Sequence, residues 1–242
     1  MKPTLSLFYS LLLVLLCCRC QTTVDSKKGS ADQRRVVLAP DTLIPTPAAI
    51  AIPSPIPLPD YDTTEWADIH LLDTTIVLDL RYATSNNFVE EQMYDCGRCF
   101  LRPAVAKGIV KVHRLLQQEG LGLKMFDCYR PRPIQWKLWN KVPDRRYVSD
   151  PRKGSMHNRG AAVDLTIVND KGEQLEMGTT YDFFGPEAWS THQGLPDSVL
   201  ANRIKLKTLL EAEGFAGIRT EWWHFSYPGK GYALSDMLWN CE

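Results

Sequence analysis

The chain has 242 residues, of which 44% are hydrophobic and 23% charged, a balance typical of a globular protein with an ordinary core. Its 28 Lys and Arg residues equal its 28 Asp and Glu residues, so the formal net charge is zero. Phosphate binding requires a clustered positive excess, and the sequence has no long basic run, so nucleic acid is not expected as a partner.

Residues 1–20 predict an export signal. Lys2 is followed by an apolar run from Leu5 to Cys18, which is shorter than the about 20 apolar residues of a membrane-spanning helix. Cys17, Cys18 and Cys20 stand where a bacterial lipoprotein carries its lipidated cysteine, so an N-terminal lipid anchor is a second interpretation of this segment. We expect an exported protein that is periplasmic or anchored to the membrane at the cell envelope.

Residues 21–61 predict a linker. The segment is polar at first and then rich in proline between Pro45 and Pro59. Proline at this density prevents a regular helix and favours an extended spacer. A tether that holds the domain away from a membrane and a plain disordered leader both fit this composition. The folded domain is expected to comprise residues 62–242.

Within the domain, the hydrophobic pattern predicts strands and helices in mixed order. The helix at 103–119 begins with Pro103 and ends before Gly120, which are typical helix boundaries. Further helices are expected at 133–142 and 198–214, and strands at 75–80, 121–129, 161–168 and 220–227. This order lacks the regular strand–helix–strand repeat of a parallel sheet. We therefore expect a single compact α+β domain with a central antiparallel sheet flanked by helices.

Four cysteines lie in this domain: Cys96, Cys99, Cys128 and Cys241. In an exported protein they are free to form disulfides. We expect a bridge from Cys96 or Cys99 to Cys241, and the spacing does not decide between the two. Cys96 and Cys99 have zinc-ribbon spacing, but no second closely spaced pair completes four ligands, so a structural zinc is not expected there.

Two short segments carry residues suited to metal chemistry. His157 and Asp164 lie in SMHNRGAAVDLTIV, where a carboxylate within an apolar strand requires a partner or a metal, because an isolated buried charge is costly. Glu221 and His224 enclose two tryptophans, a pattern that also fits an ordinary core strand. Together the segments offer three ligands and a spare carboxylate, as in a catalytic zinc site. Glu221 and His224 would point to opposite faces of a flat strand, so the strand must end, twist or bulge between them.

These segments resemble the zinc D-alanyl-D-alanine dipeptidases, the family that includes the vancomycin-resistance enzymes. LRYATSNNF (80–88), DCYRP (127–131) and MGTTYDFF (177–184) agree with the family pattern in the same order, so the resemblance spans residues 62–228. It implies one zinc ion per chain, bound by His157, Asp164 and His224, with Glu221 as the general base.

The resemblance also assigns roles to three residues around the metal. It implies that Arg130 stabilises the oxyanion, Asp182 receives the substrate's amino group and Ser155 contacts its carboxylate. Arg159 is expected to be a structural ion-pair partner. The loop at 140–154 is shorter than in the resistance enzymes. If this loop closes the cavity in the family, a shorter loop would make selectivity for dipeptides less strict.

The function that the resemblance implies is hydrolysis of the D-Ala-D-Ala dipeptide during turnover of cell-wall peptides. Two alternatives remain open at this point. The first is a D,D- or L,D-carboxypeptidase that acts on peptidoglycan peptides, and the second is a non-catalytic, zinc-stabilised wall-binding lipoprotein. Glu221 and Arg130 favour catalysis, because zinc binding alone requires neither residue.

Overall fold

The computed structural model describes residues 59–229 and 231–241, and its main feature is a five-stranded sheet. The strand order is β2 (Val77–Leu78), β4 (Leu121–Asp127), β5 (Ala162–Asn169), β7 (His224–Ser226) and β6 (Ala216–Gly217). Neighbouring strands are antiparallel except for β2, which pairs in parallel with β4 at one edge. The expected α+β domain with a central antiparallel sheet is confirmed, with this parallel edge strand as a refinement.

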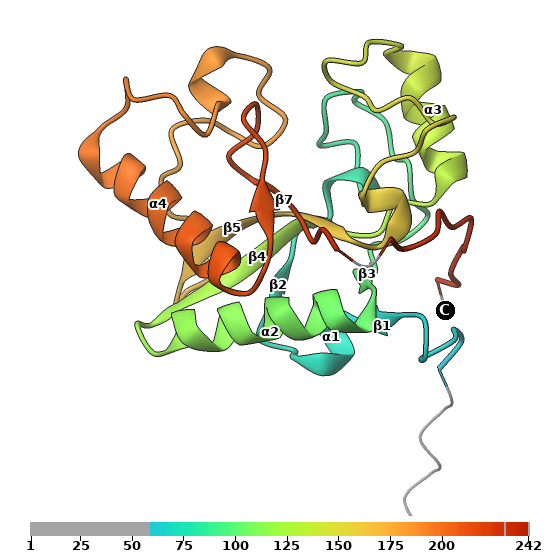
Figure 1. Cartoon of the computed structure of the whole chain (residues 1–242), viewed down its shortest axis with the longest axis horizontal. Coiled ribbons are helices and arrows are strands. Elements are labelled where there is room, and N and C mark those ends of the chain that lie inside the picture. Colours follow the sequence, from blue (N-terminus) through green and yellow to red (C-terminus); the bar gives the residue numbers. More distant parts are fainter. Residues whose placement is uncertain (1–58, 230, 242) are drawn as a thin grey trace, which may run out of the picture. The chain divides into compact units, whose positions relative to one another are not determined.

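Helices lie on different sides of the sheet (Figure 1). The longer ones are α2 (Pro103–Gln117), α3 (Arg132–Lys141) and α4 (Asp197–Ala212), and α1 (Ile69–Leu72) is a single turn. In Figure 1, α2 runs beneath the strands, α4 lies at one side, and α3 lies on the side of the strands away from α2. Val105, Ile109, Val112 and Leu116 of α2 are fully buried, because their helical spacing gathers them on one face that packs into the core.

The predicted helices agree with the observed ones to within about two residues, as is usual at helix ends, whereas two predicted strands are shorter than expected. The strand expected at 75–80 is reduced to β2, Val77–Leu78, and that expected at 220–227 to β7, His224–Ser226. A second, two-stranded sheet pairs β1 (Ala67–Asp68) with β3 (Phe100–Leu101). Short 3-10 turns are η1 (Arg81–Ala83), η2 (His157–Arg159) and η3 (Pro186–Ala188).

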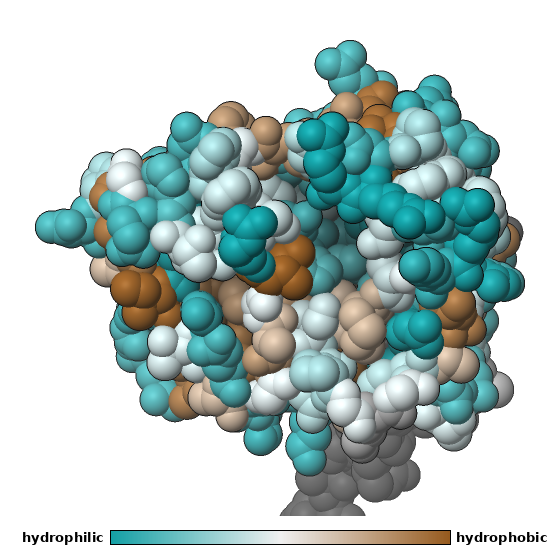
Figure 2. All heavy atoms as spheres, turned by 45° about the horizontal axis from the view of Figure 1, so that its top comes forward, coloured by the Kyte–Doolittle hydropathy of each residue, from teal (hydrophilic) through white to brown (hydrophobic). Residues whose placement is uncertain are grey.

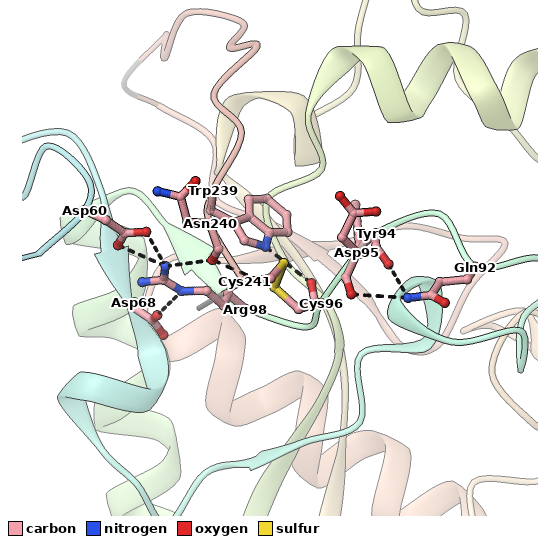
Figure 3. The surroundings of a disulfide bond; sticks show 10 residues. All are labelled: Asp60, Asp68, Gln92, Tyr94, Asp95, Cys96, Arg98, Trp239, Asn240 and Cys241. Carbon is pink, nitrogen blue, oxygen red and sulfur yellow. Dashed lines mark hydrogen bonds and ion pairs between the residues drawn. A yellow bond between two sulfur atoms is a disulfide. The ribbon is translucent and has the colours of Figure 1, made fainter.

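Two disulfides connect distant parts of the domain. Cys96 pairs with Cys241, which resolves the alternative left open by the sequence, and Cys99 pairs with Cys128. Around the first bridge, the Trp239 indole donates a hydrogen bond to the Cys96 carbonyl, as Figure 3 shows. Arg98 lies beside the bridge and donates to the carboxylates of both Asp60 and Asp68.

The extended C-terminal segment (231–241) packs beside the 3-10 turn η2. The Ser235 amide donates to the Asn158 carbonyl over 2.9 Å, and the Tyr129 hydroxyl donates to the Met237 carbonyl over 3.1 Å. A side chain on Gly154, whose φ is +71°, would clash with Leu234 at 2.2 Å. The segment therefore covers the loop that leads into η2.

The predicted export signal and almost all of the predicted linker lie outside the described residues. Among residues 59–229 and 231–241, no helix has the length and apolarity to cross a bilayer.

Candidate active site

Three side chains converge where β5 and β7 meet the turn η2. Asp164 of β5 and His224 of β7 are direct cross-strand partners, so their side chains leave the same face of the sheet. His157 comes from η2, which ends at Gly160 with φ +65°. A side chain at Gly160 would lie 2.4 Å from Trp66, so glycine is required there to place His157 beside the strands.

The donor atoms of these three residues fit a tetrahedral metal ion. His157 Nε2 lies 3.2 Å from His224 Nδ1 and 3.4 Å from Asp164 Oδ1, and the latter two atoms are 3.0 Å apart. Ligands at the usual zinc distances of about 2.0–2.2 Å lie about 3.3 Å from one another in a tetrahedron. His157, Asp164 and His224 are also the one group of metal-ligating side chains found among the described residues. The chemistry and spacing of the donors therefore fit zinc, with room for a fourth ligand.

Each prospective ligand has a partner that orients it. His157 Nδ1 donates to the Cys128 carbonyl over 2.7 Å, and the Tyr181 hydroxyl donates to Asp164 Oδ2 over 3.0 Å. His224 Nε2 lies 3.0 Å from the Ser226 hydroxyl. Such contacts fix the ring tautomers and leave His157 Nε2, His224 Nδ1 and Asp164 Oδ1 facing one point.

Electrostatics favour an ionised Asp164. Burial on its own would raise the pKa of this carboxyl, but its interactions with His157 and His224 outweigh burial and hold the pKa well below the ordinary value. A carboxylate kept ionised between two imidazoles is ready to bind a cation.

Glu221 reaches the same point from the bend that precedes β7. Its Oε2 lies 3.9 Å from His224 Nδ1. The strand begins only at His224. Glu221 therefore lies outside the strand, and its side chain is not forced to the face opposite His224. Burial, reinforced by the charge of Asp164, raises the pKa of Glu221 above its ordinary value. A carboxyl with a raised pKa beside a metal site is suited to accepting and returning a proton.

Arg130 is buried and held in a fixed orientation. Its Nε and Nη2 donate to Asp127 Oδ2 over 3.0 and 2.6 Å, and its Nη1 donates to Gln135 Oε1 over 3.0 Å. The guanidinium also lies 4.8 Å over the Tyr82 ring. A bulge in β4 between Met125 and Asp127 sets Asp127 opposite Asp164, as bulges near active sites commonly re-aim a side chain.

Asp182 and Ser155 come from two different loops that line the site. Asp182 accepts a hydrogen bond from the Tyr82 hydroxyl over 3.2 Å, and its backbone has φ +58°. Burial, followed by the charge of Asp164, raises the pKa of Asp182 well above its ordinary value. Ser155 is bonded within its own loop, to Asn158 Oδ1, through both its amide and its hydroxyl.

All seven site residues predicted from the sequence line one cavity of about 400 Å³. Figure 2 looks onto this side of the molecule, where a hollow opens between ridges of largely hydrophilic side chains. The loop at 140–154 contributes Tyr147, Val148, Ser149 and Gly154 to the lining. Arg159 also lines the cavity but donates to the Tyr232 carbonyl over 2.6 Å, and among the described residues it has no carboxylate partner.

Comparison with known proteins identifies the family. The sequence profile of a peptidase family described as D-ala-D-ala dipeptidase matches residues 62–239. The chain belongs to this family. The D-alanyl-D-alanine dipeptidase of Escherichia coli is 35% identical over 181 residues, which cover 74% of this chain and 94% of the relative. The dipeptidase of Enterococcus faecium is 30% identical over 178 residues, covering 65% and 88% of the two chains.

Similarity to solved structures is weaker. VanYB, whose structure was solved in complex with D-alanine-D-alanine, shares 15% identity with this chain, with a TM-score of 0.36, and the match covers 54% of this chain and 73% of that one. An overlap at this level supports no inference about the site. Membership of the dipeptidase family, as expected from the sequence, rests on the profile and the relatives.

Several residues around the dipeptidase site were not identified from the sequence. Asp127 stands in the same DCYRP segment as Arg130, and Tyr181 stands beside Asp182 in MGTTYDFF. Ser226 follows His224 by two residues and so points to the same side of β7. Each of these residues could have been found from the sequence, because it lies close to a predicted site residue in the same short motif or on the same side of a strand.

Proposed function

We propose that the protein hydrolyses the free dipeptide D-Ala-D-Ala, with one zinc ion per chain. Family membership and the names of the relatives support this substrate. The observation that carries the proposal is the cluster of three donor atoms 3.0–3.4 Å apart with the Glu221 carboxylate beside it. Zinc binding without catalysis would not require an additional, partly buried carboxyl at this position.

A zinc ion bound by His157, Asp164 and His224 would supply a Lewis acid that polarises water and the substrate carbonyl. The protein's own contribution is to hold the donors in place before the metal arrives. The Cys128 carbonyl, the Tyr181 hydroxyl and the Ser226 hydroxyl provide that support from behind the three ligands. Loss of such a partner commonly weakens metal binding by about 10–100-fold.

Glu221 moves the proton. As a base it takes a proton from the attacking water, and as an acid it passes this proton to the nitrogen of the leaving amino acid. The raised pKa of this partly buried carboxyl suits both steps, because a group that ionises closer to neutral pH exchanges protons in both directions. Arg130 provides a fixed positive charge for the oxygen that becomes negative, and its bonds to Asp127 and Gln135 preorganise it.

Asp182 and Ser155 are suited to recognising the two ends of a dipeptide. The Asp182 carboxyl lines the cavity close to Asp164 and Glu221, in strongly negative surroundings that raise its pKa. A substrate ammonium group there would supply the missing positive charge and favour the ionised carboxylate. Ser155, on the loop before His157, carries a hydroxyl that would turn from Asn158 Oδ1 to donate to the substrate's carboxylate.

We further propose that the protein works outside the cytoplasm, in the periplasm or anchored at the cell envelope. The apolar run within residues 1–20 supports export. Two disulfides support an oxidising compartment. Fractionation of cells, with the mass of the mature N-terminal peptide, tests this proposal and distinguishes a cleaved signal from a lipidated cysteine.

The decisive experiment measures release of D-alanine from D-Ala-D-Ala by the purified, zinc-loaded chain. L-Ala-L-Ala and N-acetyl-D-Ala-D-Ala are run in parallel, with Glu221→Gln as a near-isosteric control. Cleavage of the free D,D-dipeptide only, lost in the variant, is the expected result. Equal cleavage of the acetylated peptide would show a carboxypeptidase instead, and no cleavage by a folded, zinc-occupied chain would refute peptidase activity on these substrates.

A further inference from the structure

A second cavity adjoins the active-site cavity. It has a volume of about 310 Å³, and Arg146, Phe183, Trp189 and Arg219 are among its lining residues. Tyr147, Phe184 and Glu221 line both this cavity and the active-site cavity. These three side chains therefore form the wall between the two spaces, and two of them are aromatic.

The aromatic part of the wall is a stack built from separate loops. The rings of Tyr147 and Phe184 have centroids 4.3 Å apart at 39°. Phe184 also packs edge-to-face on Phe88 at 5.2 Å, and Phe88 on Tyr82 at 6.2 Å. Tyr147 follows α3, Phe184 follows the β5 region, and Phe88 follows η1, so three segments distant in the sequence meet at this point.

Neighbouring groups hold the stack in place. The Arg146 guanidinium lies 5.3 Å over the Tyr147 ring, and Arg146 Nε donates to both carboxylate oxygens of Asp144 over 3.0 Å. The Tyr147 ring thus contacts both a cation and the Phe184 ring. Tyr147 and Phe184 are still 39% and 41% exposed, so they stand where the cavities open to solvent.

The wall lies next to the group that is suited to the substrate's amine. Phe184 follows Asp182 by two residues. Tyr82 connects Asp182 to the stack, because its hydroxyl donates to Asp182 and its ring packs against Phe88. If the dipeptide ammonium is at Asp182, a residue added before the dipeptide's amino end must extend toward the stack.

From this arrangement we propose that Tyr147 and Phe184 determine substrate length. Their stack separates the active-site cavity from the second cavity and excludes peptides that are extended at the amino end, for which the second cavity would otherwise provide space. The proposal rests on the proposed function, because it presumes that the dipeptide amine is bound at Asp182.

The test compares Phe184→Ala with Phe183→Ala. The two phenylalanines are adjacent and both are 41% exposed, but Phe183 lines only the second cavity. For each full-length, zinc-loaded variant, kcat/KM is measured for D-Ala-D-Ala and for D-Ala-D-Ala-D-Ala. We expect the tripeptide-to-dipeptide ratio to rise by about tenfold or more in Phe184→Ala, a typical effect of a steric contact in a substrate pocket. The ratio should stay at the wild-type value in Phe183→Ala.

Tyr147→Ala provides an independent check, because it removes the other half of the stack from a different loop. It should raise the same ratio, and melting temperatures establish that all variants are folded. If the ratio is unchanged in both Phe184→Ala and Tyr147→Ala while dipeptide cleavage is retained, the proposal on substrate length is wrong but the proposed function stands. Equal use of both peptides by the wild type would also overturn the proposal on substrate length, whereas failure of the wild type on the dipeptide would refute the proposed function itself.

Discussion

Replacing Asp127 by asparagine should reduce both stability and activity. The Asp127 carboxylate is 1% exposed. It accepts two hydrogen bonds from Arg130, of 3.0 and 2.6 Å, and one from the Tyr94 hydroxyl of 3.1 Å. Asparagine has nearly the same shape but no charge, so the buried guanidinium would lose its counter-ion. Removing one partner of a buried ion pair costs about 3–5 kcal/mol, and the oxygen that asparagine retains places the expected loss near 3 kcal/mol.

That loss can be converted into measurable quantities. For a domain of this size, a change of 3 kcal/mol in the free energy of unfolding lowers Tm by about 6–12 °C. An Arg130 that is no longer fixed should lower kcat by about 100-fold, the usual effect of losing one oxyanion donor. Thermal denaturation monitored by circular dichroism and D-alanine release on the same preparation measure the two effects.

Asp150→Asn is the matched control. Its carboxylate also accepts hydrogen bonds from two arginines, Arg145 and Arg152, but their side chains are each 63% exposed. Asp150 itself is buried, but its arginine partners face solvent and it does not line the active-site cavity, so kcat should not change. The reasoning would be refuted by an Asp127→Asn variant with kcat within about threefold of wild type and Tm shifted by less than about 2 °C.

Three further outcomes are expected. Ser226→Ala should weaken zinc binding by about 10–100-fold in chelator competition, because the His224 ring loses its orienting partner; unchanged affinity would exclude this role. The acidic limb of kcat/KM should lie above pH 4.5, because burial raises the pKa of Glu221 and the base is inactive when protonated; a limb at or below that pH would contradict the assignment. His113 Nδ1 accepts a hydrogen bond from the Leu123 amide, and burial lowers the pKa of His113. The neutral imidazole therefore stabilises the fold fully above about pH 6.5, and this contribution is lost as the pH falls toward the folded-state pKa. The free energy of unfolding in urea should be lower at about pH 5 than at about pH 8, and this difference should be smaller in His113→Ala.

Local signals predicted the helices and the long strands well. α2 extends from Pro103 to Gln117 where 103–119 was expected, because its apolar spacing and its terminal proline and glycine all agree. β7 was overestimated, because the apolar character of Trp222 and Trp223 comes from burial in the core outside any strand. Hydrophobicity records that a residue is buried, and it does not record the backbone conformation in which it is buried.

The metal-ligand candidates could be predicted because they lie in short segments with recognisable residue types. The stack of Tyr147 on Phe184 could not, since it joins two loops whose sequences carry no information about their meeting. The same holds for the disulfides: Cys96 and Cys99 are three residues apart in the sequence, and only the fold sends one to Cys241 and the other to Cys128.

The Cys99–Cys128 bridge lies directly behind the metal site. The carbonyl that accepts the proton of His157 Nδ1 belongs to Cys128, whose sulfur is tied to β3 through Cys99. The disulfide thus restrains the backbone whose carbonyl orients the His157 imidazole. A chain in which this pair is reduced would therefore offer the metal a less firmly oriented ligand.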